Sequence, residues 1–399
     1  MMGADTITLG CRLNFAESEA MRSLAGDDAI IINSCAVTNE AVRQTRQAIR
    51  RAHRDRPGRR IIVTGCAAQL DPQSFAAMPE VSKVLGNADK FRPEAYTSEN
   101  RLQVSDVTAA SAPPVAAGFL SRVRSFVAVQ TGCDHRCTFC SIWQARGRSR
   151  SLPYAAVRDA IARELDAGAR EIVLTGVDIT SYDGALGPLC QRLLTDLPGL
   201  TRLRLSSLDS IEIDDALMEL VAGEPRLLPH FHLSLQAGDD LILKRMKRRH
   251  SRAEAIATVE RLKMARGDVT IGADLIAGFP TETEEQARNS LRLVDDCDIV
   301  AAHIFPFSPR PDTPAARMPQ VERELVKARA ARLREAAAVR RTAWLDRLKG
   351  SSQRVLIENG EKGHSDGFAP IRIAGSRRGD EGLARIVERD GDLLVGIFE

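Results

Sequence analysis

Three cysteines stand close together in the stretch QTGCDHRCTFCSIW: Cys133, Cys137 and Cys140. With a C-x3-C-x2-C spacing, three thiolates on one loop can hold three corners of a four-iron cluster, and no fourth cysteine lies nearby. One iron would then keep an open coordination position, which a reactive metal site needs. The alternative is a structural zinc site, for which His135 is the only local candidate for a fourth ligand. The spacing favours iron–sulfur over zinc.

Three further cysteines each follow a short apolar run in the first part of the chain. The runs cover residues 6–9, 29–32 and 60–64. They read as buried strands separated by helical patterns, so the sequence predicts a parallel α/β sheet. Ligands of such sheets bind where the strands end, and we therefore expect Cys11, Cys35 and Cys66 to converge on a second three-cysteine cluster. The alternative is three buried free cysteines.

With two such sites, the sequence resembles the methylthiotransferases, a branch of the radical S-adenosylmethionine (SAM) enzymes. The matching stretches are LGCRLNFAESEAM, NSCAVTNEA, VTGCAAQ, GCDHRCTFC and ARGRSRS. The resemblance covers nearly the whole chain and implies two 4Fe–4S clusters and SAM as cofactors. The cluster on Cys133, Cys137 and Cys140 would reduce SAM to give methionine and a 5′-deoxyadenosyl radical, which takes hydrogen from an unactivated carbon. The cluster on the other three cysteines would supply sulfur there, and a second SAM the methyl group.

The central part of the chain must position the first of these clusters. Six apolar runs read as strands, at 125–129, 171–175, 202–206, 230–235, 269–276 and 299–305. Helical patterns lie near 154–167, 186–196, 213–222, 239–265 and 282–294. Repeated strand–helix units predict a partial TIM-type barrel, which carries its chemistry at the C-terminal ends of the strands. Since Cys133 follows the first run, its cluster would lie at that mouth.

Residues at other strand ends are candidates for contacts with SAM. They lie in the blocks LTGVD, HLSLQAGDD and GADLIAGFPTETEE and in the basic run KRMKRR. The resemblance points to four of them: Gly176, Gln236, Arg248 and Asp274. The plainer alternatives are that Arg248 belongs to a basic surface and that Asp274 is a buried partner. His230 and His232 share one face of a strand, where packing is favoured over a two-histidine metal site.

The pattern divides the chain into five parts, which give an α/β fold. They are an N-terminal methylthiotransferase domain (1–100), a linker rich in proline and small residues (101–122), a radical SAM core (123–318), a basic helix (319–350) and a β-barrel (351–399). The last part consists of short strands with glycine-containing turns and resembles the TRAM domain, an RNA-binding module. It holds seven Lys and Arg against nine Asp and Glu, so RNA contact there would need a local patch such as Arg377 and Arg378.

The distribution of charge suits a polyanionic partner better than the small net charge of +3 suggests. Residues 43–60 contain eight arginines and one acidic residue, and residues 322–349 contain nine Lys and Arg against four Asp and Glu. Eight cysteines without a signal peptide predict a reducing cytoplasm. No apolar run approaches the ~18 residues that would span a membrane.

The stretch NSCAVTNEAVRQTRQ looks most like the methylthiotransferase subgroup that acts on N6-threonylcarbamoyladenosine 37, beside the anticodon of tRNA. We therefore predict methylthio transfer to C2 of that base. The partners expected are the tRNA anticodon loop and an electron donor such as flavodoxin or ferredoxin, with no DNA and no membrane. Alternative substrates are isopentenyladenosine 37 or an aspartate of a ribosomal protein. A non-enzymatic RNA-binding or iron–sulfur scaffold is the alternative of another class.

Overall fold

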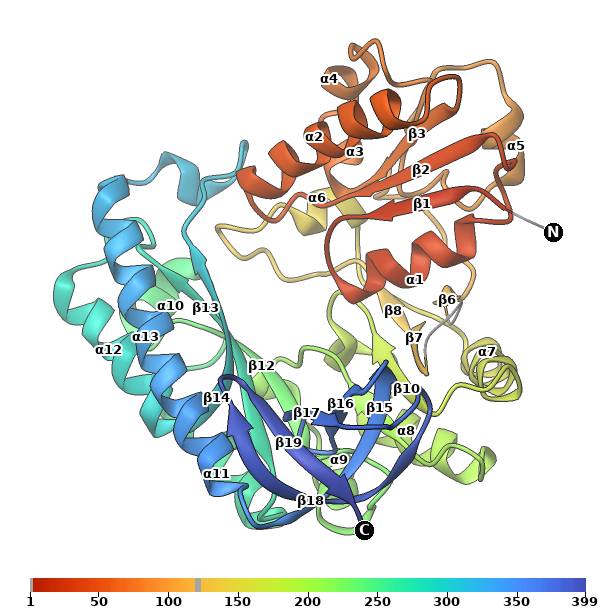
Figure 1. Ribbon diagram of the computed structural model, residues 1–399. Helices are drawn as coiled ribbons and strands as arrows, with labels where there is room; N and C mark the ends of the chain where they lie inside the picture. The colour runs from red at the N-terminus through yellow and green to blue at the C-terminus, as the bar shows by residue number, and fades with distance from the viewer. Residues whose placement is uncertain (1–2, 119–122) are drawn as a thin grey trace.

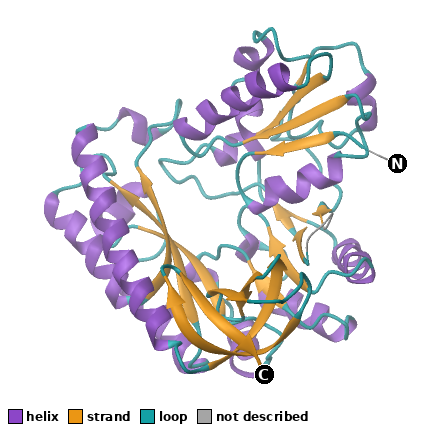
Figure 2. Ribbon diagram, viewed as in Figure 1, coloured by secondary structure: helices purple, strands orange, loops and turns teal. Residues whose placement is uncertain are grey.

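The computed structural model describes residues 3–118 and 123–399 (Figure 1). An N-terminal α/β domain and a central α/β domain lie side by side, and the long helix α13 (Arg323–Arg347) leads into a small C-terminal β-barrel (Figure 1). Helices line the outer side of the central strands (Figure 2). The predicted architecture, an α/β protein with a partial barrel and a C-terminal β-barrel, is confirmed.

The N-terminal domain is a five-stranded parallel sheet in the order β1-β2-β3-β4-β5. Its strands are β1 (Asp5–Thr8), β2 (Ala29–Ser34), β3 (Arg60–Gly65), β4 (Lys83–Leu85) and β5 (Leu102–Gln103). Its helices are α1 (Arg12–Met21), α2 (Asn39–Asp55), α3 (Cys66–Leu70), α4 (Pro72–Ala76) and α5 (Pro93–Thr97). The three longer strands lie where the apolar runs predict them. The sequence analysis missed β4 and β5, which are too short to show a periodic pattern.

The central domain contains six parallel strands that curve into a partial barrel. Its strands are β7 (Arg124–Ala128), β10 (Glu171–Thr175), β11 (Leu203–Leu205), β12 (His230–Gln236), β13 (Thr270–Ala277) and β14 (Ile299–Pro306), with the short strands β6 (Ala117–Gly118), β8 (Gln130–Thr131) and β9 (Arg150–Ser151) beside them. Its helices are α6 (Ile142–Arg146), α7 (Tyr154–Asp166), α8 (Leu186–Asp196), α9 (Asp215–Gly223), α10 (Asp240–Met246), α11 (Arg252–Ala265) and α12 (Glu284–Asp296). Pairing runs β7-β10-β11 and β12-β13-β14, and isolated bridges from Leu203 to Leu227 and from Leu208 to Leu233 connect the two halves.

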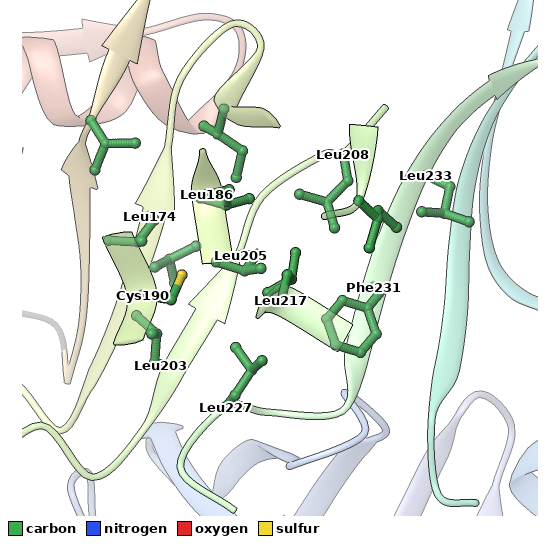
Figure 3. Close-up of a cluster of buried hydrophobic side chains, with 14 of the residues drawn as sticks. Leu174, Leu186, Cys190, Leu203, Leu205, Leu208, Leu217, Leu227, Phe231 and Leu233 are labelled. Carbon is green, nitrogen blue, oxygen red and sulfur yellow. The ribbon is translucent and has the colours of Figure 1, made fainter. Parts of the chain in front are cut away.

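Leucine-rich side chains from the strands and their covering helices form the core of the central domain (Figure 3). Leu174, Leu205 and Phe231 from three strands pack with Leu217 of α9, and all four are buried. Cys190 of α8 lies within this core, where burial raises the pKa of its thiol. Such a thiol behaves as a small apolar side chain.

The helical pattern at 239–265 is split into two helices. Lys247 adopts a left-handed conformation with φ of 58°, which ends α10. The hydroxyl of Ser251 accepts a hydrogen bond from the backbone of Glu254, whose carboxylate in turn accepts one from the backbone of Ser251. This reciprocal cap starts α11, so the turn between the helices is fixed by local chemistry that periodicity does not show.

The C-terminal barrel closes in the order β15-β16-β17-β19-β18, and its Asp366 and Gly367 accept hydrogen bonds from Arg202 and Thr270 at the N-terminal ends of central strands. Its strands are β15 (Ser352–Asn359), β16 (Lys362–Ser365), β17 (Pro370–Ile373), β18 (Glu381–Asp390) and β19 (Leu393–Phe398). The ring of Phe368 stacks between those of His230, at 5.0 Å, and His364, at 4.5 Å. The guanidinium of Arg204 lies 4.8 Å from the centre of the same ring. The barrel therefore covers the end of the central domain opposite to the cysteine loop. Within the described part of the chain, no helix has both the length and the apolar character to cross a membrane.

Candidate functional site

Cys133, Cys137 and Cys140 lie on the loop between β8 and α6, at the C-terminal mouth of the partial barrel. The loop turns at Gly132, whose φ is +76° and whose position leaves no room for a Cβ atom, because one would lie 1.8 Å from the carbonyl oxygen of Arg148. The backbone nitrogen of Cys140 donates to the carbonyl of Cys137, at 3.1 Å. Burial and the nearby Asp178 raise the pKa of the Cys133 thiol most strongly. Cys140 and Cys137 raise it further, so the three sulfurs lie close together.

His135, inside the cysteine loop, faces two carboxylates. Its Nε2 lies 2.8 Å from Asp178 and 3.8 Å from Glu212. These two carboxylates raise the pKa of His135 to about 10, so the ring is paired with acidic groups and protonated at neutral pH. The ring of His135 is bonded to Asp178, and three cysteine thiols on one loop are the donor set that fits an iron–sulfur cluster with one open iron.

Three of the four candidate SAM residues lie around this mouth. A guanidinium nitrogen of Arg248 lies 3.8 Å from Cys137 Sγ, and another donates to Asp209 at 3.0 Å. The Nε of Arg248 is buried and has no hydrogen-bond partner among the described residues, which leaves a donor free beside the cysteine loop. Gln236 has a φ of 67°, a strained conformation for a non-glycine residue. Gly176 lies against Gln130, which precedes the cysteine loop. A Cβ atom at Gly176 would lie 2.8 Å from the carbonyl oxygen of Gln130.

Asp274, the fourth candidate, lies between two histidines. Its Oδ1 is 2.9 Å from His232 Nε2 and 3.0 Å from His303 Nδ1. Burial would raise the pKa of Asp274, but the hydrogen bonds from both histidines lower it. His232 therefore has a hydrogen-bonding role on the inner face of the barrel. The second histidine of the strand, His230, packs against the C-terminal barrel instead.

Cys11, Cys35 and Cys66 lie at the carboxyl ends of β1, β2 and β3, as the strand pattern predicts. Close approach there depends on glycine, because a Cβ atom at Gly10 would lie 3.1 Å from Cys35 Cβ. Burial raises the pKa of Cys35 to about 12, and Cys66 and Cys11 contribute to the shift. The three thiols therefore share one site. Cys11 is exposed, and its thiol donates to Asn14 Oδ1 at 3.2 Å.

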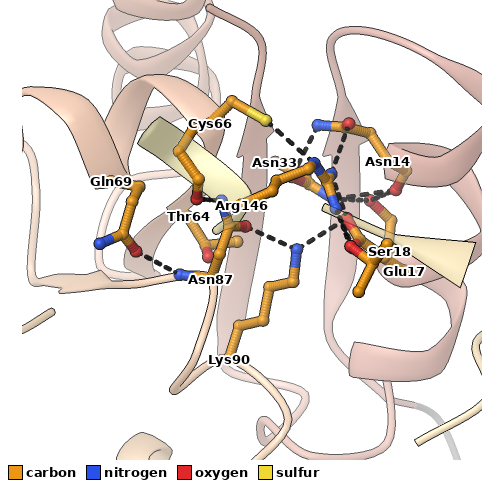
Figure 4. A network of polar contacts seen from close by, with 12 residues as sticks. Asn14, Glu17, Ser18, Asn33, Thr64, Cys66, Gln69, Asn87, Lys90 and Arg146 are labelled. Atoms are coloured by element: carbon orange, nitrogen blue, oxygen red, sulfur yellow. Dashed lines mark hydrogen bonds and ion pairs between the residues drawn. The ribbon is translucent and has the colours of Figure 1, made fainter. Parts of the chain in front are cut away.

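A buried arginine of the central domain is bonded to the N-terminal cysteine site (Figure 4). Arg146 is the last residue of α6, the helix that follows Cys140, and its Nε donates to Cys66 Sγ at 3.3 Å. Its guanidinium also donates to both carboxylate oxygens of Glu17, at 2.7 and 2.9 Å, and to Asn14 Oδ1 at 3.0 Å. Lys90 approaches the same carboxylate at 2.7 Å. One central-domain side chain is thus bonded to the N-terminal domain in four places.

The two sets of cysteines face each other across the domain boundary. Burial raises the pKa of Cys140 to about 11, and Cys66 of the other set makes a smaller contribution in the same direction. A second central-domain cation, Arg310, lies near enough to Cys35 for an electrostatic interaction and donates to Asn39 at 2.5 Å. Its Nε is buried without a hydrogen-bond partner among the described residues. Cations beside these thiols fit an anionic cluster there.

Sequence reasoning missed the residues that join the domains. Arg146 lies in the matched stretch ARGRSRS, and Asn14 and Glu17 lie in LGCRLNFAESEAM. The motifs therefore contain these residues but do not show that they contact one another. Arg12, in the second of these stretches, was also missed. Burial and the nearby Arg124 and Arg204 lower its pKa to about 10, so it remains charged at neutral pH.

Comparisons with known proteins agree with this geometry. Residues 4–86 match a family described as uncharacterized protein family UPF0004, and residues 127–294 match the Radical SAM superfamily. The threonylcarbamoyladenosine tRNA methylthiotransferase MtaB of Rickettsia prowazekii is 43% identical over 92% of this chain and 91% of its own length. MtaB of Thermotoga maritima is 36% identical over 88% of this chain and 85% of its own length. The tRNA-2-methylthio-N(6)-dimethylallyladenosine synthase of Anaeromyxobacter sp. is 33% identical, over 98% of this chain and 92% of its own length.

A solved structure with a related fold is that of the radical S-adenosylmethionine methyltransferase TsrM from Kitasatospora setae. It has a TM-score of 0.55 and 15% identity, and the similarity covers 76% of this chain and 68% of that one. At this identity the likeness shows the fold alone. The sequence identity to curated relatives over nearly their whole length is decisive: the chain belongs to the MtaB family of radical SAM methylthiotransferases and is a transferase.

Proposed function

We propose that this protein transfers a methylthio group to C2 of N6-threonylcarbamoyladenosine 37 in tRNA. The observation that carries the proposal is the opposition of two three-cysteine sites across one domain boundary, with Arg146 of the central domain bonded to Cys66 and Glu17 of the N-terminal domain. The relatives named for this substrate reach 43% identity, against 33% for the dimethylallyladenosine synthase of Anaeromyxobacter sp..

The chain offers distinct residues for each cofactor. Cys133, Cys137 and Cys140 would hold the 4Fe–4S cluster that binds SAM, with Gly176, Gln236 and Arg248 around the SAM molecule. Cys11, Cys35 and Cys66 would hold a second 4Fe–4S cluster, beside the cations Arg146 and Arg310. When bound, these groups supply radical chemistry from SAM at the first site and sulfur at the second. Asp274 stays a candidate for the SAM or substrate side, although its carboxylate already accepts hydrogen bonds from His232 and His303.

The residues of the chain position the base between the two sites. The target base lies in a single-stranded loop, so it can be turned out of the loop at modest cost. Exposed cations near the cysteine loop, among them Arg136, Arg148, Lys247 and Arg249, would contact the phosphates around it. We propose flavodoxin or ferredoxin as the electron donor. A tRNA substrate and free thiols that need a reducing compartment also lead us to propose a cytoplasmic location.

Labelling distinguishes this function from the alternatives. The reconstituted enzyme is incubated without oxygen with methyl-labelled SAM, a reductant, tRNA and ribosomal protein. The proposal expects label in tRNA, and label in ribosomal protein alone would contradict it. Production of 5′-deoxyadenosine excludes a non-enzymatic scaffold.

A further inference from the structure

Arg12 is a positive charge inside the molecule that lacks a counter-ion. It is the first residue of α1 and directly follows Cys11. Its side chain is only partly exposed, yet it forms no hydrogen bond or ion pair with any residue in 3–118 or 123–399. Taking a guanidinium out of water without a partner is costly, and such groups in proteins are usually paired. The described side chains of the protein therefore supply no hydrogen-bonded partner for this charge.

Arg12 lies where the N-terminal domain meets the partial barrel. Helix α1 packs against the barrel, where Phe15 meets Phe126 edge to face at 5.5 Å. Arg12 lies within electrostatic range of Asp274 on β13 and of Arg124 and Arg204 on the central strands. Its backbone is thus next to a cysteine of the second site and its charge is near the inner face of the barrel.

The neighbouring carboxylates are already occupied by other cations or donors. Glu171 accepts from Arg204 at 2.8 Å and from Arg202 at 3.2 Å. Asp274 accepts from two histidines, as described above. With Arg124 and Arg204 nearby as well, the surroundings of Arg12 favour an added anion.

We propose that Arg12 binds the carboxylate of the threonylcarbamoyl group on the target base. This inference rests on the proposed function and identifies the residue that recognises the substituent. The substituent on N6 ends in the carboxylate of threonine, and an arginine can bind a carboxylate with two parallel hydrogen bonds. The base must lie next to the cysteines that supply sulfur, and Arg12 is adjacent in sequence to one of them. Recognition of this kind discriminates strongly, because an analogue without the charge leaves the partly buried arginine unpaired.

The test measures binding of anticodon stem-loop RNAs to the full-length reconstituted protein. Three RNAs are compared, with N6-threonylcarbamoyladenosine at position 37, with its neutral threonine carboxamide analogue, and with unmodified adenosine. The unsubstituted protein should bind the carboxylate RNA roughly 10- to 100-fold more tightly than the carboxamide RNA. Arg12→Gln should bind both equally, and Arg12→Lys should keep a smaller preference. The matched control is Arg170→Gln, an exposed arginine that is not among the charges acting on Arg12, which should keep the full ratio.

Two results would overturn the inference. One is an unsubstituted protein that binds the carboxylate and carboxamide RNAs equally, which needs no variant to fold. The other is an Arg12→Gln protein that keeps the full ratio, or that loses affinity equally for all three RNAs, as a phosphate contact would. Failure of the proposed function looks different: the unsubstituted protein would then not distinguish threonylcarbamoyladenosine from adenosine and would not methylthiolate either RNA.

Discussion

Replacing Arg146 with methionine tests the link between the two domains. Methionine keeps much of the length of the side chain but removes the charge and every donor. The carboxylate of Glu17 loses two hydrogen bonds, at 2.7 and 2.9 Å, and keeps only Lys90. Asn14 Oδ1 and Cys66 Sγ each lose a donor as well.

Breaking a buried ion pair by removing one partner costs about 3–5 kcal/mol. Because Lys90 still neutralises Glu17, we expect the lower end, about 3 kcal/mol, or about a 150-fold shift in the unfolding equilibrium. The loss of a cation beside Cys66 should also weaken retention of a cluster at the N-terminal cysteines. The radical SAM cysteines lie on another loop and should keep their iron.

The assay combines unfolding in guanidinium with iron analysis of the reconstituted protein. The matched control is Arg148→Met, two residues away in the same motif, whose side chain is 75% exposed and has a carboxylate only at 3.8 Å. A surface change of this kind costs within about 0.5 kcal/mol. If Arg146→Met unfolded at the same denaturant concentration as Arg148→Met and kept all its iron, the reasoning about the buried network would be wrong.

Three further predictions concern the clusters and the buried carboxylate. Cys133→Ala should abolish SAM cleavage, whereas Cys11→Ala should cleave SAM without adding sulfur; identical behaviour, measured as 5′-deoxyadenosine and thiolated nucleoside, would refute separate roles. Gly132→Ala should lose the radical SAM cluster, seen as lost iron and visible absorbance, because its Cβ would lie 1.8 Å from a carbonyl oxygen; full iron content would contradict this. Burial would raise the pKa of Glu17 from 4.5, but Arg146 and Lys90 lower it to about 2. The ionised carboxylate therefore stabilises the fold above pH 4.5, and this stability is lost as the pH falls towards 2, by roughly 3 kcal/mol. Glu17→Gln should reduce the change in the free energy of unfolding between these pH values. An unchanged dependence on pH would count against the network.

The sequence predicts much of the fold because its strands are apolar and its cysteines follow them. Convergence of Cys11, Cys35 and Cys66 follows from the rule that parallel strands end at one edge. The strand β16 escaped detection because it reads KGHS, with Gly363 where a Cβ would lie 1.9 Å from the carbonyl oxygen of Leu356. Close packing at this strand depends on the missing side chain of Gly363, which a hydrophobic pattern cannot show.

Contacts across the domain boundary could not be predicted from the sequence. Arg146 bonds to Glu17, which lies 129 positions earlier in the chain. No periodicity connects two such positions, because their pairing depends on how two separately patterned domains dock. The sequence also could not show that Arg12 lacks a partner among the described residues. That becomes visible only in the structure, where the nearby carboxylates already accept hydrogen bonds from other residues.

The most direct test is nucleoside mass spectrometry of total tRNA from cells with and without the gene for this protein. The account predicts that the methylthio form of threonylcarbamoyladenosine alone disappears and that the unthiolated nucleoside accumulates. Loss of methylthio-isopentenyladenosine instead would contradict the proposed substrate while leaving the chemistry intact. An unchanged nucleoside profile would contradict the assignment to tRNA.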